Sequence, residues 1–96
     1  MRILIVEDEK KVAAFIKKGL EEETYAVDIA TDGEEGLYLG EQNQYDLIIL
    51  ELMLPKINGL DILSSLRSKE IETPILLLTA KAVSYTHLTL PTIREV

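Results

Sequence analysis

Three short apolar runs each end in side chains that could bind a cation or a phosphoryl group. The run at 3–6 is followed by Glu7 and Asp8, the run at 47–50 by Glu51, and the run at 75–78 by Thr79. If these runs are neighbouring parallel strands, the side chains meet at one rim of a sheet, where open α/β sheets bind their ligands. Carboxylates this close repel one another unless a cation joins them.

The donor atoms of this cluster favour magnesium. Oxygen ligands without nitrogen or sulfur suit Mg²⁺ better than zinc or copper, and one or two carboxylates suffice because Mg²⁺ usually keeps several waters. Each residue also has an ordinary structural explanation. Glu7 and Asp8 could cap the following helix, where negative charge is favourable, and Thr79 could simply end a strand. Their joint placement favours the binding site.

The elements that must position these residues alternate between strands and helices. Short, β-branched apolar runs predict strands at 2–6, 25–29, 46–50 and 75–78. Helical spacing and turn residues predict helices at about 9–22, 32–42 and 60–69. This alternation predicts an α/β fold with right-handed crossovers and a mostly parallel sheet.

The helices are expected to turn apolar or small residues toward the sheet. Asp32 should cap the second helix, with Glu35 completing a pattern like a capping box. The inward faces are expected to comprise Val12, Phe15, Ile16 and Leu20 in the first helix, Gly36 and Gly40 in the second, and Leu60, Leu63 and Leu66 in the third.

Composition excludes several classes of protein. The 96 residues allow one domain, and the net charge of −7 argues against DNA binding by this chain itself. The chain has no cysteine, so disulfides and Cys-ligated zinc are excluded. No apolar stretch approaches the roughly 20 residues of a membrane span, and the apolar run at the start of the chain is too short for a secretory signal. There is no glycine-rich nucleotide loop. These features fit a cytoplasmic protein.

Residues 82–96 depart from the alternation of strands and helices. The segment 84–90 alternates between two sets of side chains and could form an added strand, which would be antiparallel because the link from Thr79 is too short for a parallel crossover. Disorder is an equally good interpretation. His87 lies in this segment without a second histidine, so it is assigned no role.

Three motifs carry a family resemblance. They are ILIVED at 3–8, YDLIILELMLPKINGLDIL at 45–63 and TPILLLTAK at 73–81. Residues 1–81 resemble the receiver domain of a two-component response regulator, most of all the subfamily with a C-terminal winged-helix DNA-binding domain. A weaker likeness is to regulators that respond to copper and other heavy metals. The resemblance implies a flavodoxin-like open parallel sheet of order 2-1-3-4 with flanking helices.

The same resemblance implies roles for the residues at the strand ends. Asp8 would hold Mg²⁺ directly, Glu7 would assist through water, and Met53 would offer its backbone carbonyl. Thr79 would contact a phosphoryl oxygen. Position 51 is where the family has the aspartate that accepts a phosphoryl group from a histidine kinase, and Glu51 would also be a metal ligand.

The chain departs from this family at two places. Its fourth helix, fifth strand and fifth helix have no counterpart after residue 81, so the sequence is interpreted as truncated there, with 82–96 as a tail outside the family. The family's phosphate-binding lysine is missing, since Leu90 precedes Pro91 and Lys81 matches a different position. This loss should leave the apolar run at 75–78, from Ile75 on, as an edge strand open to self-association.

The second departure is Glu51 itself. One added carbon–carbon bond of about 1.5 Å pushes the carboxylate into the space of a phosphoryl group, and a 1 Å error can cost on the order of a hundredfold in rate. We therefore expect a signalling module, not an enzyme, that is not phosphorylated or that partly mimics the phosphorylated state. One alternative is an interaction domain that works without phosphorylation. The other is a Mg²⁺-dependent phosphohydrolase, which would want an aspartate nucleophile.

Overall fold

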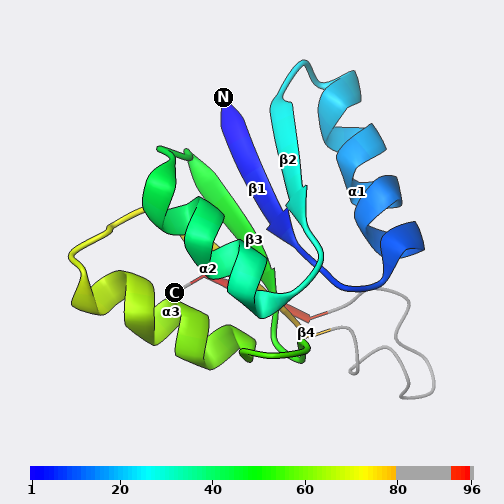
Figure 1. Cartoon of the computed structure of the whole chain (residues 1–96). Helices are drawn as coiled ribbons and strands as arrows, with labels where there is room; N and C mark the ends of the chain where they lie inside the picture. Colours follow the sequence, from blue (N-terminus) through cyan, green and yellow to red (C-terminus); the bar gives the residue numbers. More distant parts are fainter. Residues whose placement is uncertain (80–91, 96) are drawn as a thin grey trace.

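Strands and helices alternate along the chain and build one sheet with helices on both faces (Figure 1). The computed structural model describes residues 1–79 and 92–95. The elements in chain order are β1 (Arg2–Val6), α1 (Lys10–Glu22), β2 (Ala26–Ala30), α2 (Gly33–Gln42), β3 (Leu47–Glu51), α3 (Gly59–Ser68), β4 (Ile75–Thr79) and β5 (Thr92–Glu95). Each predicted helix or strand up to β4 begins and ends within one residue of these bounds.

The sheet has the order β2-β1-β3-β4-β5 within the described residues. Strand β1 pairs in parallel with β2 and β3, and β3 pairs in parallel with β4. The predicted α/β class and the flavodoxin-like order 2-1-3-4 are confirmed. In this register Val6 lies opposite Leu50, so the residues that follow β1 and end β3 leave the sheet side by side.

Strand β5 lies along the outer side of β4. The two are antiparallel, with Leu76 opposite Glu95 and Thr79 opposite Thr92. The run 75–78 is therefore not an open edge, because backbone pairing with β5 occupies it, and the antiparallel direction expected of a strand from 82–96 is confirmed. The strand considered at 84–90 lies outside the described residues.

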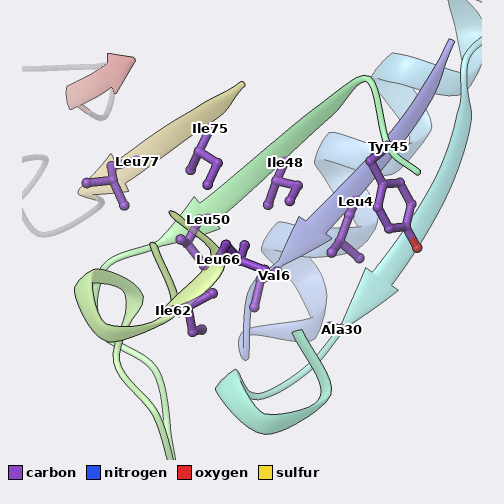
Figure 2. Close-up of a cluster of buried hydrophobic side chains, with 10 residues drawn as sticks. All are labelled: Leu4, Val6, Ala30, Tyr45, Ile48, Leu50, Ile62, Leu66, Ile75 and Leu77. Carbon is purple, nitrogen blue, oxygen red and sulfur yellow. The ribbon is translucent and has the colours of Figure 1, made fainter. Parts of the chain in front are cut away.

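The larger core cluster lies between the sheet and the helices α2 and α3. Figure 2 shows side chains from β1, β3 and β4 meeting Ile62 and Leu66 of α3. Gly36 lets α2 approach β1, because a Cβ at this position would stand 2.6 Å from Cγ1 of Val6. The prediction that α2 packs through its glycines is confirmed.

The caps of α2 partly match the predicted pattern. The Asp32 side chain accepts a hydrogen bond from the backbone N–H of Glu35 at 2.8 Å, as expected of an N-cap. The Glu35 carboxylate accepts from the backbone N–H of Thr31 at 2.9 Å, one residue before the position of a standard capping box.

Helix α1 covers the other face of the sheet. Ala13 is buried there with Ile5 and Val27, and Ile16 and Leu20 pack against them. Phe15 was predicted to face inward, and this is wrong, since 80% of its surface is exposed. It follows Ala13 by two residues, which turns it about 200° around the helix.

The inward face of α3 also differs from the prediction. Ile62 and Leu66 are fully buried, Leu63 is half-buried, and Leu60 is 55% exposed. Leu60 precedes Ile62 by two residues and therefore faces the opposite side of the helix. Within the described part of the chain, no helix has the length and apolar character needed to cross a membrane.

Candidate functional site

Two carboxylates that are far apart in sequence meet at the C-terminal ends of β1 and β3. Glu7 directly follows β1 and Glu51 ends β3, and only 2% and 6% of their respective surfaces are exposed. Glutamates are rarely buried to this degree without a partner. Their burial follows from the register of the two parallel strands, which places the C-terminal ends of β1 and β3 side by side at one rim of the sheet.

Backbone N–H groups satisfy one oxygen of each carboxylate. Glu7 Oε2 accepts from the N–H of Glu9 at 2.9 Å, and Glu51 Oε1 accepts from the N–H of Met53 at 3.3 Å. Within the described residues, no buried side-chain nitrogen or oxygen lacks a hydrogen-bond partner.

The surroundings of the pair favour the protonated form of Glu7. The pKa of Glu7 is raised to about 7, mainly by burial and also by the negative charges of Glu51 and Asp8, against the opposing effect of the Glu9 N–H. Burial also raises the pKa of Glu51, but the N–H groups of Met53 and Leu52 and a hydrogen bond from Glu7 act against that rise. The raised pKa therefore favours the protonated form of Glu7, which donates a hydrogen bond to the Glu51 carboxylate.

Asp8 affects the pair electrostatically. It is exposed, and its carboxylate raises the pKa of both glutamates by repulsion. The backbone N–H of Met53 contacts the Glu51 carboxylate, while the residue as a whole is 54% exposed. Thr79 ends β4 beside β3, as its strand position predicts. The Thr79 side chain lies outside the described part.

The residues present fit a hard cation in their chemistry. Burial raises the pKa values of two neighbouring carboxyl groups, and a cation bound between them would stabilise their ionised forms. In the part of the chain that the structure describes, no group of three Asp, Glu, His or Cys side chains is arranged to hold a metal. Magnesium does not require such a group, since it is usually bound by one or two carboxylates and several waters.

Sequence reasoning missed the residues that fix the loop between β3 and α3. The N–H of Gly33 donates to the Pro55 carbonyl at 3.2 Å, and Lys56 Nζ lies 3.4 Å from an Asp32 oxygen. A Cβ at Gly33 would stand 1.9 Å from the Ile57 carbonyl oxygen. Nothing local in the sequence predicts this contact between the start of α2 and a loop more than 20 residues later.

Gly59 fixes the other end of the same loop. Its N–H donates to the Leu52 carbonyl at 2.9 Å, and a Cβ there would stand 2.5 Å from the Glu51 carbonyl oxygen. The backbone that follows Glu51 is therefore held by the starts of two helices, α2 and α3, and this positions residues 51–53.

A second polar cluster lies at the opposite end of the strands. Tyr45 Oη donates to Asp28 Oδ2 at 2.7 Å, and Arg2 Nη2 lies 2.9 Å from the same oxygen. The Arg2 guanidinium also lies 5.0 Å from the centre of the Tyr45 ring. The hydrogen bond from Tyr45 and then the Arg2 contacts lower the pKa of Asp28. Burial raises the pKa of Tyr45 to about 12, and Asp28 adds to the rise.

Comparison with known proteins gives one consistent match. A family model described as the response regulator receiver domain matches residues 3–90. The response regulator ArlR of Staphylococcus saprophyticus is 52% identical over 84 residues, which are 88% of this chain and 38% of that protein. The transcriptional regulatory protein CusR of Escherichia coli K12 is 52% identical over 80 residues, which are 83% of this chain and 35% of that protein.

Solved structures agree with the sequence matches. The receiver domain of the Francisella response regulator 1452 superposes with a TM-score of 0.80 at 38% identity, covering 88% of this chain and 69% of that one. The response regulator TrrA of Thermotoga maritima, solved in complex with Mg(2+)-BeF, superposes with a TM-score of 0.78 at 41% identity, covering 90% and 71%. The chain spans less than two-fifths of the curated relatives' length.

Proposed function

The chain belongs to the response regulator receiver family of two-component systems, and from this membership we propose that it is a receiver module whose phosphorylation is blocked by Glu51. Receiver domains are signalling modules rather than enzymes, and histidine kinases phosphorylate them. By resemblance, Glu51 stands where the family carries the aspartate that accepts the phosphoryl group.

The burial and bonding of Glu51 support this proposal. Only 6% of the surface of Glu51 is exposed, and its carboxylate accepts hydrogen bonds from the Met53 N–H and from the protonated Glu7 side chain. An attacking carboxylate needs a free oxygen in line with the phosphoryl donor, close to van der Waals contact. The longer side chain turns its oxygens toward Met53 and Glu7, so the attack geometry is lost.

Magnesium belongs to the same proposal. Asp8 would hold it directly, Glu7 would contact it through water, and Glu51 and the Met53 carbonyl would complete the protein ligands. Thr79 would contact a phosphoryl oxygen. When bound, Mg²⁺ would offset the charge of these carboxylates and of a phosphoryl group. TrrA, a structural relative, was solved with Mg(2+)-BeF, which supports magnesium as the metal.

The partner we propose is a histidine kinase, and the compartment is the cytoplasm. The chain spans 38% of ArlR, so control of transcription is proposed for a whole regulator and not for these residues. We place the receiver part at 1–81, where the last motif ends, with 82–96 outside it, although the family match continues to residue 90.

The hydrogen bond between Glu7 and Glu51 favours a second candidate function. Because the raised pKa of Glu7 favours its protonated form, the charge of the pair is reduced without any metal. The domain would then bind a partner in one fixed state, as an interaction domain that needs neither phosphorylation nor Mg²⁺. Removal of Mg²⁺ with a chelator would leave partner binding unchanged for this second function and would weaken it for the first.

The blocking role of Glu51 is tested by intact-mass measurement. The parent chain and Glu51→Asp are incubated with Mg²⁺ and a small phosphodonor such as acetyl phosphate. We expect no added mass on the parent and one phosphoryl group on Glu51→Asp. Stoichiometric phosphorylation of the parent at Glu51 would overturn the proposal. A failure of Glu51→Asp as well would place the block elsewhere in the site.

A further inference from the structure

The outward face of α1 carries an exposed aromatic residue between charged residues of opposite sign. Lys11, Phe15, Lys18 and Glu22 follow one another at spacings of four, three and four residues, which places them on a single line along the helix. All four are exposed, and Phe15 has 80% of its surface in solvent. We call these four residues the α1 stripe.

Small residues flank the α1 stripe and leave room for another chain. Ala14 and Gly19 lie on either side of the line and are exposed, and a Cβ at Gly19 would meet nothing within 4 Å. A depression of about 560 Å³ beside Phe15 is lined by Phe15, Ile16, Lys18, Gly19, Leu20 and Glu22. An aromatic ring from a partner would fit such a depression.

The charges of the α1 stripe are unpaired within the part of the chain that the structure describes. The ion pair within this helix joins Lys17 and Glu21, which lie off the stripe. Lys11, Lys18 and Glu22 form no salt bridge with another described residue. Along the stripe, two unpaired lysines with Phe15 between them are therefore followed by the unpaired carboxylate of Glu22.

This order is complementary to itself when reversed. In an antiparallel pair of α1 helices related by a two-fold axis, Lys11 of each copy lies opposite Glu22 of the other, and Phe15 lies opposite Lys18. Ala14 then lies opposite Gly19, so the two backbones can approach closely. A two-fold interface requires one patch to complement itself in this way.

We propose that the α1 stripe is the interface of a symmetric dimer in which a second copy of this chain packs its own α1 antiparallel. Each Phe15 is buried against the aliphatic part of Lys18 in the other copy and in the depression beside Gly19 of that copy. The two Lys11–Glu22 contacts fix the direction and the register of the helices. An arrangement with parallel helices would bring Lys11 against Lys11 and is disfavoured by repulsion.

The dimer is expected to be weak. A 13-residue helix is about 20 Å long, so the buried area falls at the low end of protein interfaces. Much of the association would come from Phe15, since aromatic anchors dominate small interfaces and exposed ion pairs contribute less. The interface uses neither Glu51 nor magnesium and does not depend on the function proposed above.

Charge reversal tests the pairing, since both reversals suit the helix. Lys11→Glu places negative charge near the N-terminus of α1 and Glu22→Lys places positive charge at its C-terminus, which the helix dipole favours. Sedimentation equilibrium over micromolar to millimolar concentrations should show a monomer–dimer equilibrium for the parent. Each single reversal should weaken dimerisation about tenfold, because two contacts become repulsive. Phe15→Ala should weaken it at least as much.

Recovery of the dimer distinguishes the proposed pairing from a general effect of charge. The double variant Lys11→Glu/Glu22→Lys should dimerise like the parent, and an equimolar mixture of the two single variants should form heterodimers. Lys10→Glu and Glu21→Lys make the same charge changes off the stripe and should leave the equilibrium unchanged. A parent that stays monomeric, controls that weaken the dimer equally, or a double variant that fails to recover would each overturn the proposal.

Discussion

The protonation of Glu7 links the candidate site to pH. Its pKa of about 7 is raised from 4.5 mainly by burial, so the folded state holds a proton that the unfolded state releases above pH 4.5. A raised pKa contributes stability that is present in full below pH 4.5 and is lost as pH rises through 7. The expected loss is about 1–3 kcal/mol, from roughly 1.4 kcal/mol per pKa unit reduced for strong coupling to Glu51.

Replacing Glu7 with glutamine should remove most of this pH dependence. Glu7→Gln cannot ionise, so its free energy of unfolding should stay nearly level between pH 5 and pH 8 and exceed that of the parent at pH 8. Urea unfolding at both pH values measures the difference. Equal slopes with pH in parent and variant would show that Glu7 does not hold the proton.

At the other end of the strands, Tyr45 should stabilise the ionised form of Asp28. Tyr45→Phe removes the hydrogen bond to Asp28, and we expect a loss of about 1 kcal/mol in unfolding free energy at neutral pH. The pKa of Asp28 should rise toward its ordinary value, because the first cause of its lowering is gone. The parent loses unfolding free energy as pH falls through the lowered pKa of Asp28. In Tyr45→Phe this loss should be smaller.

Carboxyl NMR titration follows Asp28 directly. Tyr38→Phe serves as the matched control, since Tyr38 is 62% exposed and the hydrogen bond to Asp28 comes from Tyr45. An unchanged Asp28 pKa in Tyr45→Phe would contradict the assigned cause.

At the scale of elements, the loop after β3 depends on the space left by Gly33. An added Cβ would lie 1.9 Å from the Ile57 carbonyl oxygen, which belongs to the backbone and must shift. Gly33→Ala should therefore cost about 1–3 kcal/mol, as overpacking usually does. Gly19→Ala, in open space within α1, should instead stabilise by about 0.5–1 kcal/mol. Thermal unfolding at low protein concentration compares the two, and a destabilising Gly19→Ala would contradict this account.

The sequence predicted the elements and the mostly parallel sheet, because short β-branched runs and helical periodicity are local signals. The strand order came from the family resemblance, since no local signal carries it. The sequence also predicted that Glu7 and Glu51 share a rim, since both directly follow buried strands. It failed at Phe15 and Leu60, where an apolar residue at helical spacing lies on the outer face and no local signal distinguishes the two faces. The contact between Gly33 and the loop at Ile57 was missed because it depends on how α2 meets a distant segment.

At the scale of the molecule, magnesium should stabilise the fold by binding the folded state alone. At ten times its dissociation constant, a ligand adds about 1.4 kcal/mol to the unfolding free energy. The increase should be larger at pH 8 than at pH 6, because Glu7 must release its proton for the site to take a cation. Asp8→Asn should reduce it. An equal shift from NaCl at matched ionic strength would show that screening, and not a site, is responsible.

The chain aligns with 69% of one solved receiver domain, yet its first four strands keep the register that brings Glu7 and Glu51 together. The rim of the site is thus formed by the first four strands. Its chemistry then depends on residue 51.

The most direct measurement of the central claim is the rate of phosphoryl incorporation at residue 51. Parent and Glu51→Asp are treated side by side with acetyl phosphate and Mg²⁺, and peptide mapping locates the modification over time. We expect incorporation at position 51 in Glu51→Asp and a rate at least about a hundredfold lower in the parent. Comparable incorporation at Glu51 in the parent would contradict it.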